Sequence, residues 1–246
     1  MKDIEELVKN VKKYKNSVVQ QKFKSKKNTV AYVTINNKPR VLKWFVPGLK
    51  RQMENEYNIL KKGAKKLNIP TVFEKDSKKN VLILNYIMGE NLCDLVNSDI
   101  SIGEKKKLMI LLAEWFYEFH NFFKNEDEFL IRGDSILRNF IFTDRISGVD
   151  FEEARKGKVV EDIAGMCSSI LSTDPMFTSE KFILCEKFVE SYNDLAPGRI
   201  LKINDEIAYS ILEKIQWRPE KEEILRKFSK RIRQKGLSHY KIIKRI

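Results

Sequence analysis

The chain has 246 residues, 42% of them hydrophobic and 33% charged, which suits a globular protein with a sizeable core. Its 47 Lys and Arg against 34 Asp and Glu give a formal net charge of +13. No apolar run is long enough to predict a transmembrane segment, and the N-terminus has no signal-peptide core. Three cysteines without CxxC spacing disfavour a disulfide framework and a zinc site, so we expect a cytoplasmic protein with reduced thiols.

The first 88 residues predict about five strands around one helix. A short polar helix pattern at Ile4, Leu7, Val8 and Val11 comes first. Runs rich in Val and Tyr then predict strands at 18–23, 30–35, 41–46, 72–74 and 81–86. Apolar residues at three- and four-residue steps predict a helix over 52–67, which Ile69-Pro70 terminates.

After residues 88–90 the pattern becomes helical. Residues 104–123 carry the broad apolar face of a buried central helix, and further helices are predicted at 161–172, 179–194, 203–216 and 219–234. We therefore expect a two-lobed α+β fold, with a β-rich N-terminal lobe over 1–88 and a mostly helical C-terminal lobe over 89–246.

The stretch RGDSILRNFIFTDRISGVDFEEA, residues 132–154, holds three oxygen side chains on a turn and two apolar runs. If 139–142 and 147–151 pair as a hairpin around Thr143-Asp144-Arg145, Asn139 and Asp150 come to one end of it, and Asp134 faces them from the preceding loop. An amide oxygen and a carboxylate at one point can hold Mg²⁺. A separate carboxylate nearby can orient an attacking hydroxyl or accept its proton.

These motifs resemble those of the protein-kinase-like superfamily. RGDSILRNFIF is similar to its catalytic loop, His-x-Asp with Asn five residues later, and GVDFEEA resembles its metal-binding Asp-Phe-Gly segment. The resemblance implies that Asp134 is the catalytic aspartate and that Asn139 and Asp150 bind Mg²⁺. Two positions depart from the pattern, because Arg132 stands where His is usual and Glu152 where Gly is usual.

The resemblance extends upstream in the same order. Lys43 in VLKWF matches the phosphate-binding lysine, and Glu56 in ENEYNILKK matches its helix partner, with Glu54 as the second choice. Residues 84–92 resemble the hinge that contacts adenine through backbone groups, which implies roles for Asn85 and Ile87. Without the resemblance, Lys43 and Glu56 would be interpreted as an exposed strand lysine and a surface helix glutamate.

Two further residues have both a family and a structural interpretation. His120 falls where many members carry a Leu-His pair before the catalytic loop, and we expect it to be a buried structural histidine. Asp162 resembles the aspartate that opens the next helix and braces the catalytic-loop backbone. A plain carboxylate at a helix N-terminus is the competing explanation.

Two features of the family are missing. No GxGxxG lies between the first strands, where the turn reads KSKKNT, so Lys24, Lys26, Lys27 or the Asn28-Thr29 backbone would have to cover the ATP phosphates. Only twelve positions separate Asp150 from Asp162, which leaves no room for an activation segment that docks peptides. The acceptor is therefore expected to be a small molecule or a sugar.

The resemblance implies an ATP- and Mg²⁺-dependent phosphotransferase, with ATP between the lobes and a hydroxyl acceptor of unknown identity. Similar small, atypical members are aminoglycoside-type phosphotransferases, lipopolysaccharide (Kdo) kinases, RIO-type kinases and the small kinase of the KEOPS complex. The alternatives are a kinase-like ATPase or switch subunit of a KEOPS-like RNA-modifying assembly, and an atypical protein kinase that autophosphorylates on serine or threonine. A pseudokinase is supported only by the lost glycines.

The basic charge concentrates at the C-terminus. Residues 218–246 contain eleven basic and three acidic residues, and none is acidic from Ile224 onward. Ile224, Phe228 and Ile232 recur every four residues, which predicts an amphipathic helix that packs on the helical lobe. Its basic side is either simply solvated or binds RNA or another anionic partner.

Overall fold

The structure, a computed structural model, describes residues 4–10, 17–23, 25, 27–126 and 128–237. The chain forms two compact units. The β-rich unit comprises Met1–Met88 and Asp150–Glu153, and the helical unit comprises Gly89–Val149 and Ala154–Ile246. The predicted α+β class with a β-rich and a helical part is confirmed. In the described part of the chain, no helix is both long and apolar enough to cross a membrane.

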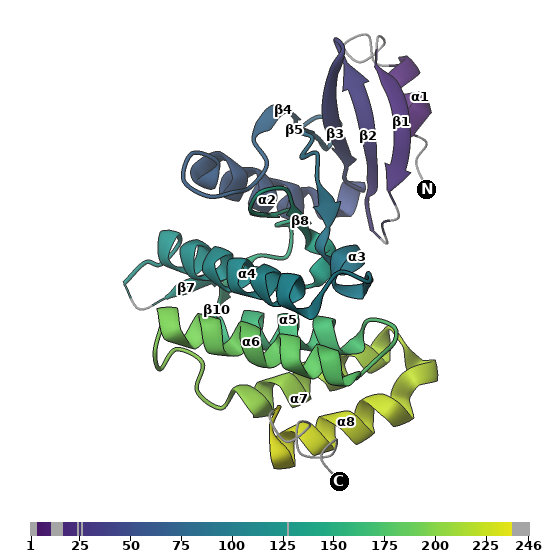
Figure 1. The fold of residues 1–246 in the computed structure, drawn as a ribbon. Coiled ribbons are helices and arrows are strands. Elements are labelled where there is room, and N and C mark those ends of the chain that lie inside the picture. Colours follow the sequence, from purple (N-terminus) through teal and green to yellow (C-terminus); the bar gives the residue numbers. More distant parts are fainter. Residues whose placement is uncertain (1–3, 11–16, 24, 26, 127, 238–246) are drawn as a thin grey trace. The chain divides into compact units, whose positions relative to one another are not determined.

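The β-rich unit is built on a five-stranded antiparallel sheet with the strand order β1-β2-β3-β5-β4 (Figure 1). The strands are β1 (Val18–Phe23), β2 (Thr29–Ile35), β3 (Lys38–Trp44), β4 (Val72–Asp76) and β5 (Val81–Asn85). Asn36 and Asn37 join β2 to β3 with φ angles of 51° and 59°. Two residues of this conformation make the tight hairpin turn that an Asn-Asn pair favours.

Two helices contact different faces of this sheet. Ile4, Leu7 and Val8 of α1 (Ile4–Asn10) share a buried cluster with Leu42 of β3. The next residue, Lys43, contacts Glu56 of α2 (Lys50–Gly63) instead. Because successive side chains of a strand point to opposite faces, α2 serves the face on which Lys43 lies.

The helical unit consists mainly of packed helices. They are α3 (Leu92–Asn97), α4 (Ile102–Phe122), α5 (Val159–Ser172), α6 (Ser179–Leu195), α7 (Ile203–Glu213) and α8 (Glu222–Lys235). In Figure 1 the long helices α4 and α6 run side by side, and α7 and α8 lie beyond α6. Ser101 and Glu104 begin α4 with a reciprocal capping box, in which each side chain accepts the other's backbone N–H.

The helical unit also contains two small sheets of short strands. β6 (Glu90–Asn91), β8 (Phe140–Phe142) and β9 (Ile146–Gly148) form a three-stranded sheet, while β7 (Phe129–Ile131) pairs with β10 (Arg155–Gly157). The 3₁₀ turn at Leu137–Asn139 leads directly into β8. The predicted catalytic loop therefore lies between β7 and β8, which belong to two different sheets.

Most predicted elements are present, with different ends. The helix predicted over 52–67 ends at Gly63, and hydrogen-bonded turns continue the chain, with the Leu67 N–H donating to the Gly63 carbonyl. The helices predicted over 203–216 and 219–234 each contain a 3₁₀ turn, at Lys214–Gln216 and Pro219–Lys221. Helix α3 and strands β6, β7 and β10 were not predicted, because they are too short to show a period. Val11 lies outside the described residues.

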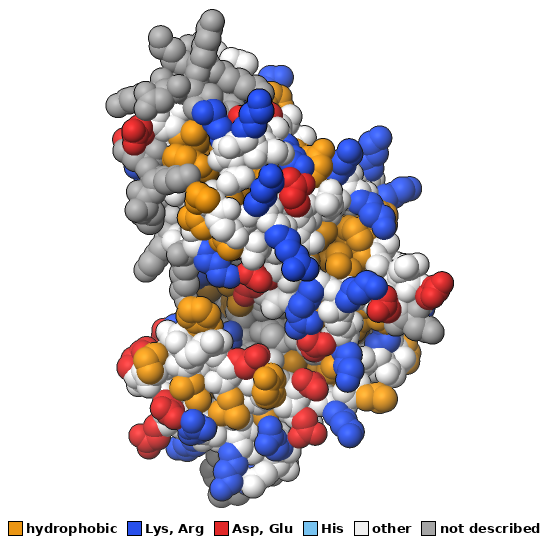
Figure 2. All heavy atoms as spheres, turned by 180° about the vertical axis from the view of Figure 1, so that it is seen from behind, with side chains coloured by type: hydrophobic (Ala, Val, Ile, Leu, Met, Phe, Trp, Pro, Cys, Tyr) orange, Lys and Arg blue, Asp and Glu red, His pale blue; other side chains and the backbone are white. Residues whose placement is uncertain are grey.

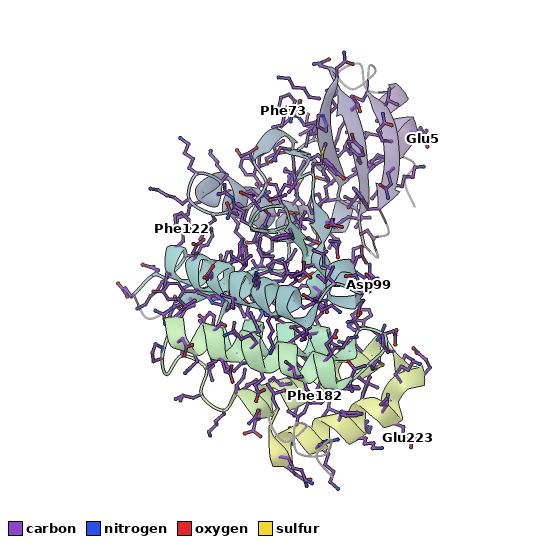
Figure 3. The ribbon with its side chains drawn as sticks, viewed as in Figure 1. Glu5, Phe73, Asp99, Phe122, Phe182 and Glu223 are labelled. Atoms are coloured by element: carbon purple, nitrogen blue, oxygen red, sulfur yellow. The ribbon has the colours of Figure 1, made fainter. Side chains whose placement is uncertain are left out.

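The apolar side of α8 packs as expected. Phe228 stacks on Phe177 with 4.0 Å between the ring centroids and lies near Phe182 of α6, which is labelled in Figure 3. Leu225 and Ile232 are fully buried on the same helix. The hydrophobic seam therefore faces the other helices and leaves most of the basic side chains of α8 toward solvent.

Candidate functional site

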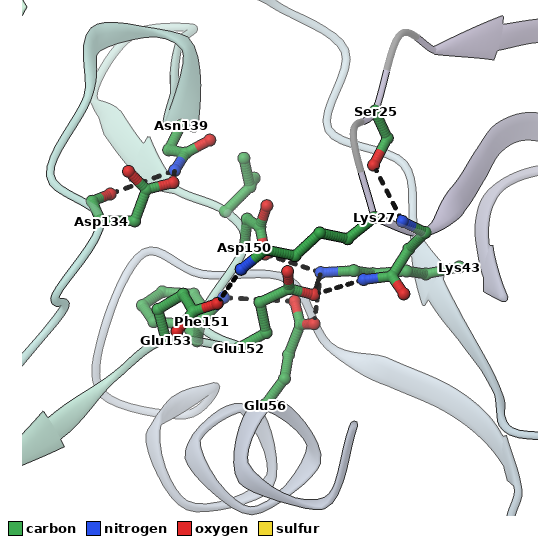
Figure 4. Close-up of polar contacts among 12 residues, drawn as sticks. Ser25, Lys27, Lys43, Glu56, Asp134, Asn139, Asp150, Phe151, Glu152 and Glu153 are labelled. Atoms are coloured by element: carbon green, nitrogen blue, oxygen red, sulfur yellow. Dashed lines mark hydrogen bonds and ion pairs between the residues drawn. The ribbon is translucent and has the colours of Figure 1, made fainter. Parts of the chain in front are cut away.

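Lys43 is the centre of the polar contacts in the β-rich unit. It lies in β3, only 5% of its surface is exposed, and its Nζ is 2.7 Å from Oε2 of Glu56 (Figure 4). Glu54, the second choice for this partner, instead contacts Lys75. A helical period explains the difference, because Glu56 lies on the buried face of α2 with Met53 and Leu60.

Two more carboxylates surround the same ammonium group. Asp150 Oδ1 lies 2.6 Å from Lys43 Nζ, and Glu152 Oε2 lies 3.0 Å from it. Burial lowers the pKa of the lysine, but attraction to the three carboxylates outweighs burial and leaves that pKa raised. Lys43 is therefore firmly cationic.

Two of these carboxylates, Glu56 and Glu152, also have raised pKa values. Burial raises the pKa of Glu56, and the neighbouring Asp150 raises it further, whereas Lys43 lowers it. Glu152 follows the same pattern, with burial as the first cause of its raised pKa. Three carboxylates share one cation, so the cluster as a whole attracts a further positive charge.

Helix α2 holds the segment that carries these acids. The Phe151 side chain is fully buried, and the backbone N–H of Phe151 donates to Glu56 Oε1 over 3.3 Å. Asn55 Nδ2 donates to the carbonyls of Phe151 and Glu152. Asp150 adopts a left-handed backbone with φ of 64°, a conformation that Asp tolerates better than most residues.

The turn between β1 and β2 also contacts this segment. Asn28 Nδ2 donates to Glu152 Oε2 over 2.6 Å, and Lys27 forms an ion pair with Glu153. The Asn28 N–H is fixed by the Ser25 hydroxyl at 3.3 Å. Two of the predicted phosphate-covering residues thus face acidic side chains, while Lys24 and Lys26 lie outside the described residues.

In the helical unit, Asp134 and Asn139 are in direct contact. Asn139 Nδ2 donates to the backbone carbonyl of Asp134 over 3.1 Å and to its Oδ2 over 3.2 Å (Figure 4). Both acceptors bind the nitrogen end of the amide, so Oδ1 of Asn139 is the end suited to a cation. Asp134, expected to face Asn139 from the preceding loop, therefore contacts it, and the catalytic and metal-binding roles of the two residues stay predictions.

Asp162 braces the loop that precedes Asp134. Its Oδ2 accepts the Arg132 N–H over 2.7 Å, and its Oδ1 accepts the Gly133 N–H over 3.1 Å and the Ser135 hydroxyl over 2.7 Å. His120 Nε2 lies 3.1 Å from Oδ2. Burial raises the pKa of Asp162, but the bond and the charge of His120, with the loop donors, lower it overall. The bracing interpretation therefore describes Asp162 better than a plain helix-terminus carboxylate.

His120 is the buried structural histidine that we expected. It has no exposed surface, and its Nδ1 lies 2.9 Å from the Tyr192 hydroxyl while its Nε2 faces Asp162. Both ring nitrogens are thus occupied by neighbours inside the helical unit.

Arg132, where the superfamily pattern has His, ties the loop to the β8–β9 hairpin. Its Nη2 donates to the Val149 carbonyl over 2.7 Å, and its guanidinium lies 4.7 Å from the Phe140 ring centroid. Val149 in turn donates its N–H to the Asn139 carbonyl over 2.9 Å. Since Asp150 follows Val149 in the chain, these bonds fix the residue that directly precedes the proposed metal ligand.

The predicted hairpin is present but shorter. β8 and β9 pair at Phe140–Phe142 and Ile146–Gly148, and the Thr143 N–H donates to the Arg145 carbonyl over 3.1 Å. The second strand was expected to extend to Phe151 but ends at Gly148. Residues Asp150–Glu153 belong to the β-rich unit, so long-range contacts rather than strand propensity decide where β9 ends.

The hinge residues Asn85 and Ile87 lie in the β-rich unit, at and just after the end of β5. The Asn85 N–H donates to the Thr71 carbonyl over 3.0 Å, and its Oδ1 accepts the Thr71 hydroxyl over 2.9 Å. These two groups of Asn85 are therefore engaged within the sheet. Adenine contacts at Asn85 and Ile87 stay predictions.

Oxygen donors for a metal ion are present in both units. In the described part of the chain, carboxylate oxygens of Glu56, Asp150 and Glu152 lie within 4.8 Å of one another. Asp150 is the most exposed of them, at 39% of its side chain. Carboxylate oxygens of this kind fit Mg²⁺ rather than a soft metal, and Asn139 and Asp150 as its ligands stay predictions.

Sequence reasoning missed three contributors. Asn55 donates to the Glu152 carbonyl and the Ser135 hydroxyl donates to the Asp162 carboxylate, and no local pattern marks either residue. Glu152 was noted only as a departure from the Asp-Phe-Gly pattern, yet it contacts Lys43. That departure was the available signal, because an acid beside a metal-binding segment alters its charge.

Comparison with known proteins identifies the fold. Neither a protein-family model nor a curated protein sequence matches the chain. Among solved structures, aminoglycoside phosphotransferase APH(4)-Ia is similar with a TM-score of 0.65 and 10% identity, over 95% of this chain and 97% of that one. The chain has a protein-kinase-like fold.

Two other structures support this assignment. A ternary complex of streptomycin, ATP and APH(2")-IIa matches with a TM-score of 0.59 and 18% identity, over 87% of this chain and 89% of that one. A choline/ethanolamine kinase family protein from Mesorhizobium loti matches with a TM-score of 0.61 and 13% identity, over 97% and 92%. At these identities the similarity establishes the fold, and the aminoglycoside-type resemblance expected from sequence is confirmed at that level.

Proposed function

We propose that this protein is an ATP- and Mg²⁺-dependent phosphotransferase that moves the γ-phosphate of ATP to the hydroxyl of a small molecule or sugar. One observation carries the proposal: Lys43, buried in a strand of a kinase-like fold, contacts both Glu56 and Asp150. A buried lysine positioned by a helix glutamate beside a metal-binding aspartate is the arrangement with which protein kinases transfer a phosphoryl group.

In the β-rich unit, the proposed roles follow from charge and exposure. The Lys43 ammonium would neutralise phosphate oxygens, while Glu56 holds it in place from α2. Asp150 keeps a substantially exposed carboxylate, which suits a ligand for the cation. Mg²⁺, when bound, would neutralise the charge that develops on the transferred phosphoryl group.

In the helical unit, the proposed roles follow from the loop geometry. Asp134 would orient the acceptor hydroxyl and accept its proton. Asn139 would present Oδ1 to the metal, because its Nδ2 is occupied by Asp134. Asp162 would keep the loop in shape through the backbone donors of Arg132 and Gly133.

A small acceptor is supported by the short connection after Asp150. The strand β10 begins at Arg155 and pairs with β7, and α5 already begins at Val159. The chain therefore has no long segment at this point on which a peptide could dock. Aminoglycoside phosphotransferases and a choline/ethanolamine kinase family protein, among the similar structures, fit this size of acceptor.

The test is transfer of labelled γ-phosphate from ATP with Mg²⁺, for the wild type and Asp134→Ala. Each protein is assayed alone, with pooled sugars, amino alcohols and aminoglycosides, and with bulk tRNA. Acceptor-dependent product that is lost in Asp134→Ala supports the proposal. Labelling of the protein itself would favour the autophosphorylating alternative, and a folded wild type that neither binds nor turns over ATP contradicts both.

The second candidate is a kinase-like ATPase or switch in an RNA-modifying assembly, and α8 is the observation in its favour. Lys227, Lys230, Arg231, Gln234 and Lys235 line a surface hollow of about 320 Å³. Figure 2, in contrast, shows a face on which Lys and Arg are scattered among acidic side chains rather than gathered. This candidate predicts tRNA binding that falls steeply with salt, survives Asp134→Ala and is lost in Lys227→Glu/Lys230→Glu.

A further inference from the structure

Glu152 contacts Lys43, which the proposed function assigns to ATP phosphates, and Asn28 of the turn between β1 and β2. Its Oε2 accepts from Asn28 Nδ2 over 2.6 Å and lies 3.0 Å from Lys43 Nζ. All three residues belong to the β-rich unit, and only 10% of the Glu152 side chain is exposed. A superfamily member with glycine at this position would have no side chain there to make either contact.

The residues next to Asn28 and Glu152, Lys27 and Glu153, make a similar contact nearer the surface. Lys27 pairs with Glu153, so two consecutive turn residues contact two consecutive acids (Figure 4). The outer pair is about half exposed, with 50% of Lys27 and 40% of Glu153 accessible. Exposed pairs contribute little, so the buried contact of Glu152 is the stronger of the two.

The charge around Lys43 is already more than balanced. Glu56, Asp150 and Glu152 each place an oxygen within 3.0 Å of its Nζ. Glu56 is needed to position the lysine and Asp150 is the proposed metal ligand. Glu152 has neither task, and its carboxylate is an acceptor of the same kind as a phosphate oxygen.

We propose that Glu152 is a carboxylate gate, which competes with nucleotide phosphates for Lys43 and Asn28 and must release both before phosphates bind. The inference rests on the proposed function in assigning phosphate to Lys43. A phosphate that binds here would take the place of the Glu152 carboxylate at Lys43 and Asn28. Nucleotide affinity is therefore limited by Glu152, and removal of its charge increases that affinity.

The test uses Glu152→Gln, which keeps the shape and removes the charge, and Glu152→Asp, which keeps the charge on a shorter stem. Glu54→Gln is the matched control, since Glu54 pairs with Lys75 on the same unit. Calorimetry on the full chain measures the Kd of Mg-ATP, of ATP without Mg²⁺ and of inorganic tripolyphosphate. Thermal unfolding of each variant shows that it is folded.

We expect Glu152→Gln to bind all three ligands about tenfold more tightly, the change that one charge-assisted hydrogen bond produces. Glu152→Asp should lie between it and the wild type, and Glu54→Gln should equal the wild type. Tripolyphosphate has no adenine, so a parallel response there assigns the effect to the phosphates.

Unchanged or weaker binding by folded Glu152→Gln overturns the gate, and weaker binding of the Mg²⁺ complexes alone would make Glu152 a metal ligand instead. Tighter binding without phosphate transfer to any acceptor would keep the gate and reject the phosphotransferase. Phosphate transfer by the wild type, without tighter ligand binding in Glu152→Gln, would keep the phosphotransferase and reject the gate. If neither protein binds any of the three ligands, both inferences fail.

Discussion

The amide nitrogen of Asn139 donates to both the backbone carbonyl and the carboxylate of Asp134, at 3.1 and 3.2 Å. The Asn139 side chain thereby orients the proposed general base Asp134, and the same hydrogen bonds fix the direction of its own oxygen Oδ1. The two roles proposed for these residues, proton acceptance and metal binding, are therefore linked within residues 134–139.

Loss of the Asp134 carboxylate should therefore stop chemistry without unfolding the protein. We expect Asp134→Ala to lower kcat by about 10²- to 10⁴-fold, the usual contribution of a general base. The matched control is Asp144→Asn, because Asp144 is an exposed carboxylate in the turn of the nearby β8–β9 hairpin. Equal losses in both variants, or a large fall in the melting temperature of Asp134→Ala, would contradict the assigned role.

Lys43 should be required for both stability and activity, by different routes. Lys43→Met leaves Glu56 buried beside Asp150 and Glu152, so we expect a loss of about 3–5 kcal/mol in the free energy of unfolding. Adding Glu56→Gln should restore part of that stability, since the buried charge is gone, but none of the activity. Urea unfolding measures the first effect and ATP turnover the second. Recovery of turnover in the double variant would exclude Lys43 from phosphate binding.

Acid should destabilise the helical unit through Asp162. Its pKa is lowered in the folded state, so its contribution to stability is complete above the unfolded pKa of about 4 and is lost as pH falls through the folded pKa. We expect Asp162→Asn to lower the free energy of unfolding by about 1.5–3 kcal/mol at pH 7, because the hydrogen-bond donors around residue 162 lose a charged acceptor. Between pH 7 and pH 2, the free energy of unfolding should then change less with pH in the variant than in the wild type. An identical pH slope in both proteins would show that Asp162 is not the titrating brace.

Gly148 should be intolerant of any side chain. A Cβ there would collide with the Trp115 ring and lie 2.9 Å from Arg132 Nη1. Gly148→Ala should therefore cost about 1–3 kcal/mol by overpacking and should displace the arginine that bonds to the Val149 carbonyl. Gly103→Ala is the control, since its Cβ would meet only Ser101 Oγ at 3.7 Å. Comparable stability of the two variants in urea would contradict the packing argument.

The fold class was predictable from local patterns, whereas the site motifs were predicted from their resemblance to the protein-kinase-like superfamily. Runs rich in Val and Tyr predicted the strands around Lys43, and Asp134 was expected to face Asn139, with which it is in contact. Element ends were less predictable. The strand expected to reach Phe151 stops at Gly148, because the buried Phe151 ring and its bond to Glu56 commit the next residues to the β-rich unit.

The sequence by itself determined which residue types are present and at what spacing: a lysine in a strand, an acid on a helix and an Asp-Asn-Asp series. Only the tertiary structure decided that Glu152 reaches the same ammonium group as Asp150, and that four donors converge on Asp162. Contacts between residues 107 positions apart, such as Lys43 with Asp150, leave no trace in local periodicity. They depend on how packed elements bring side chains together, and that packing decides which acids share a cation.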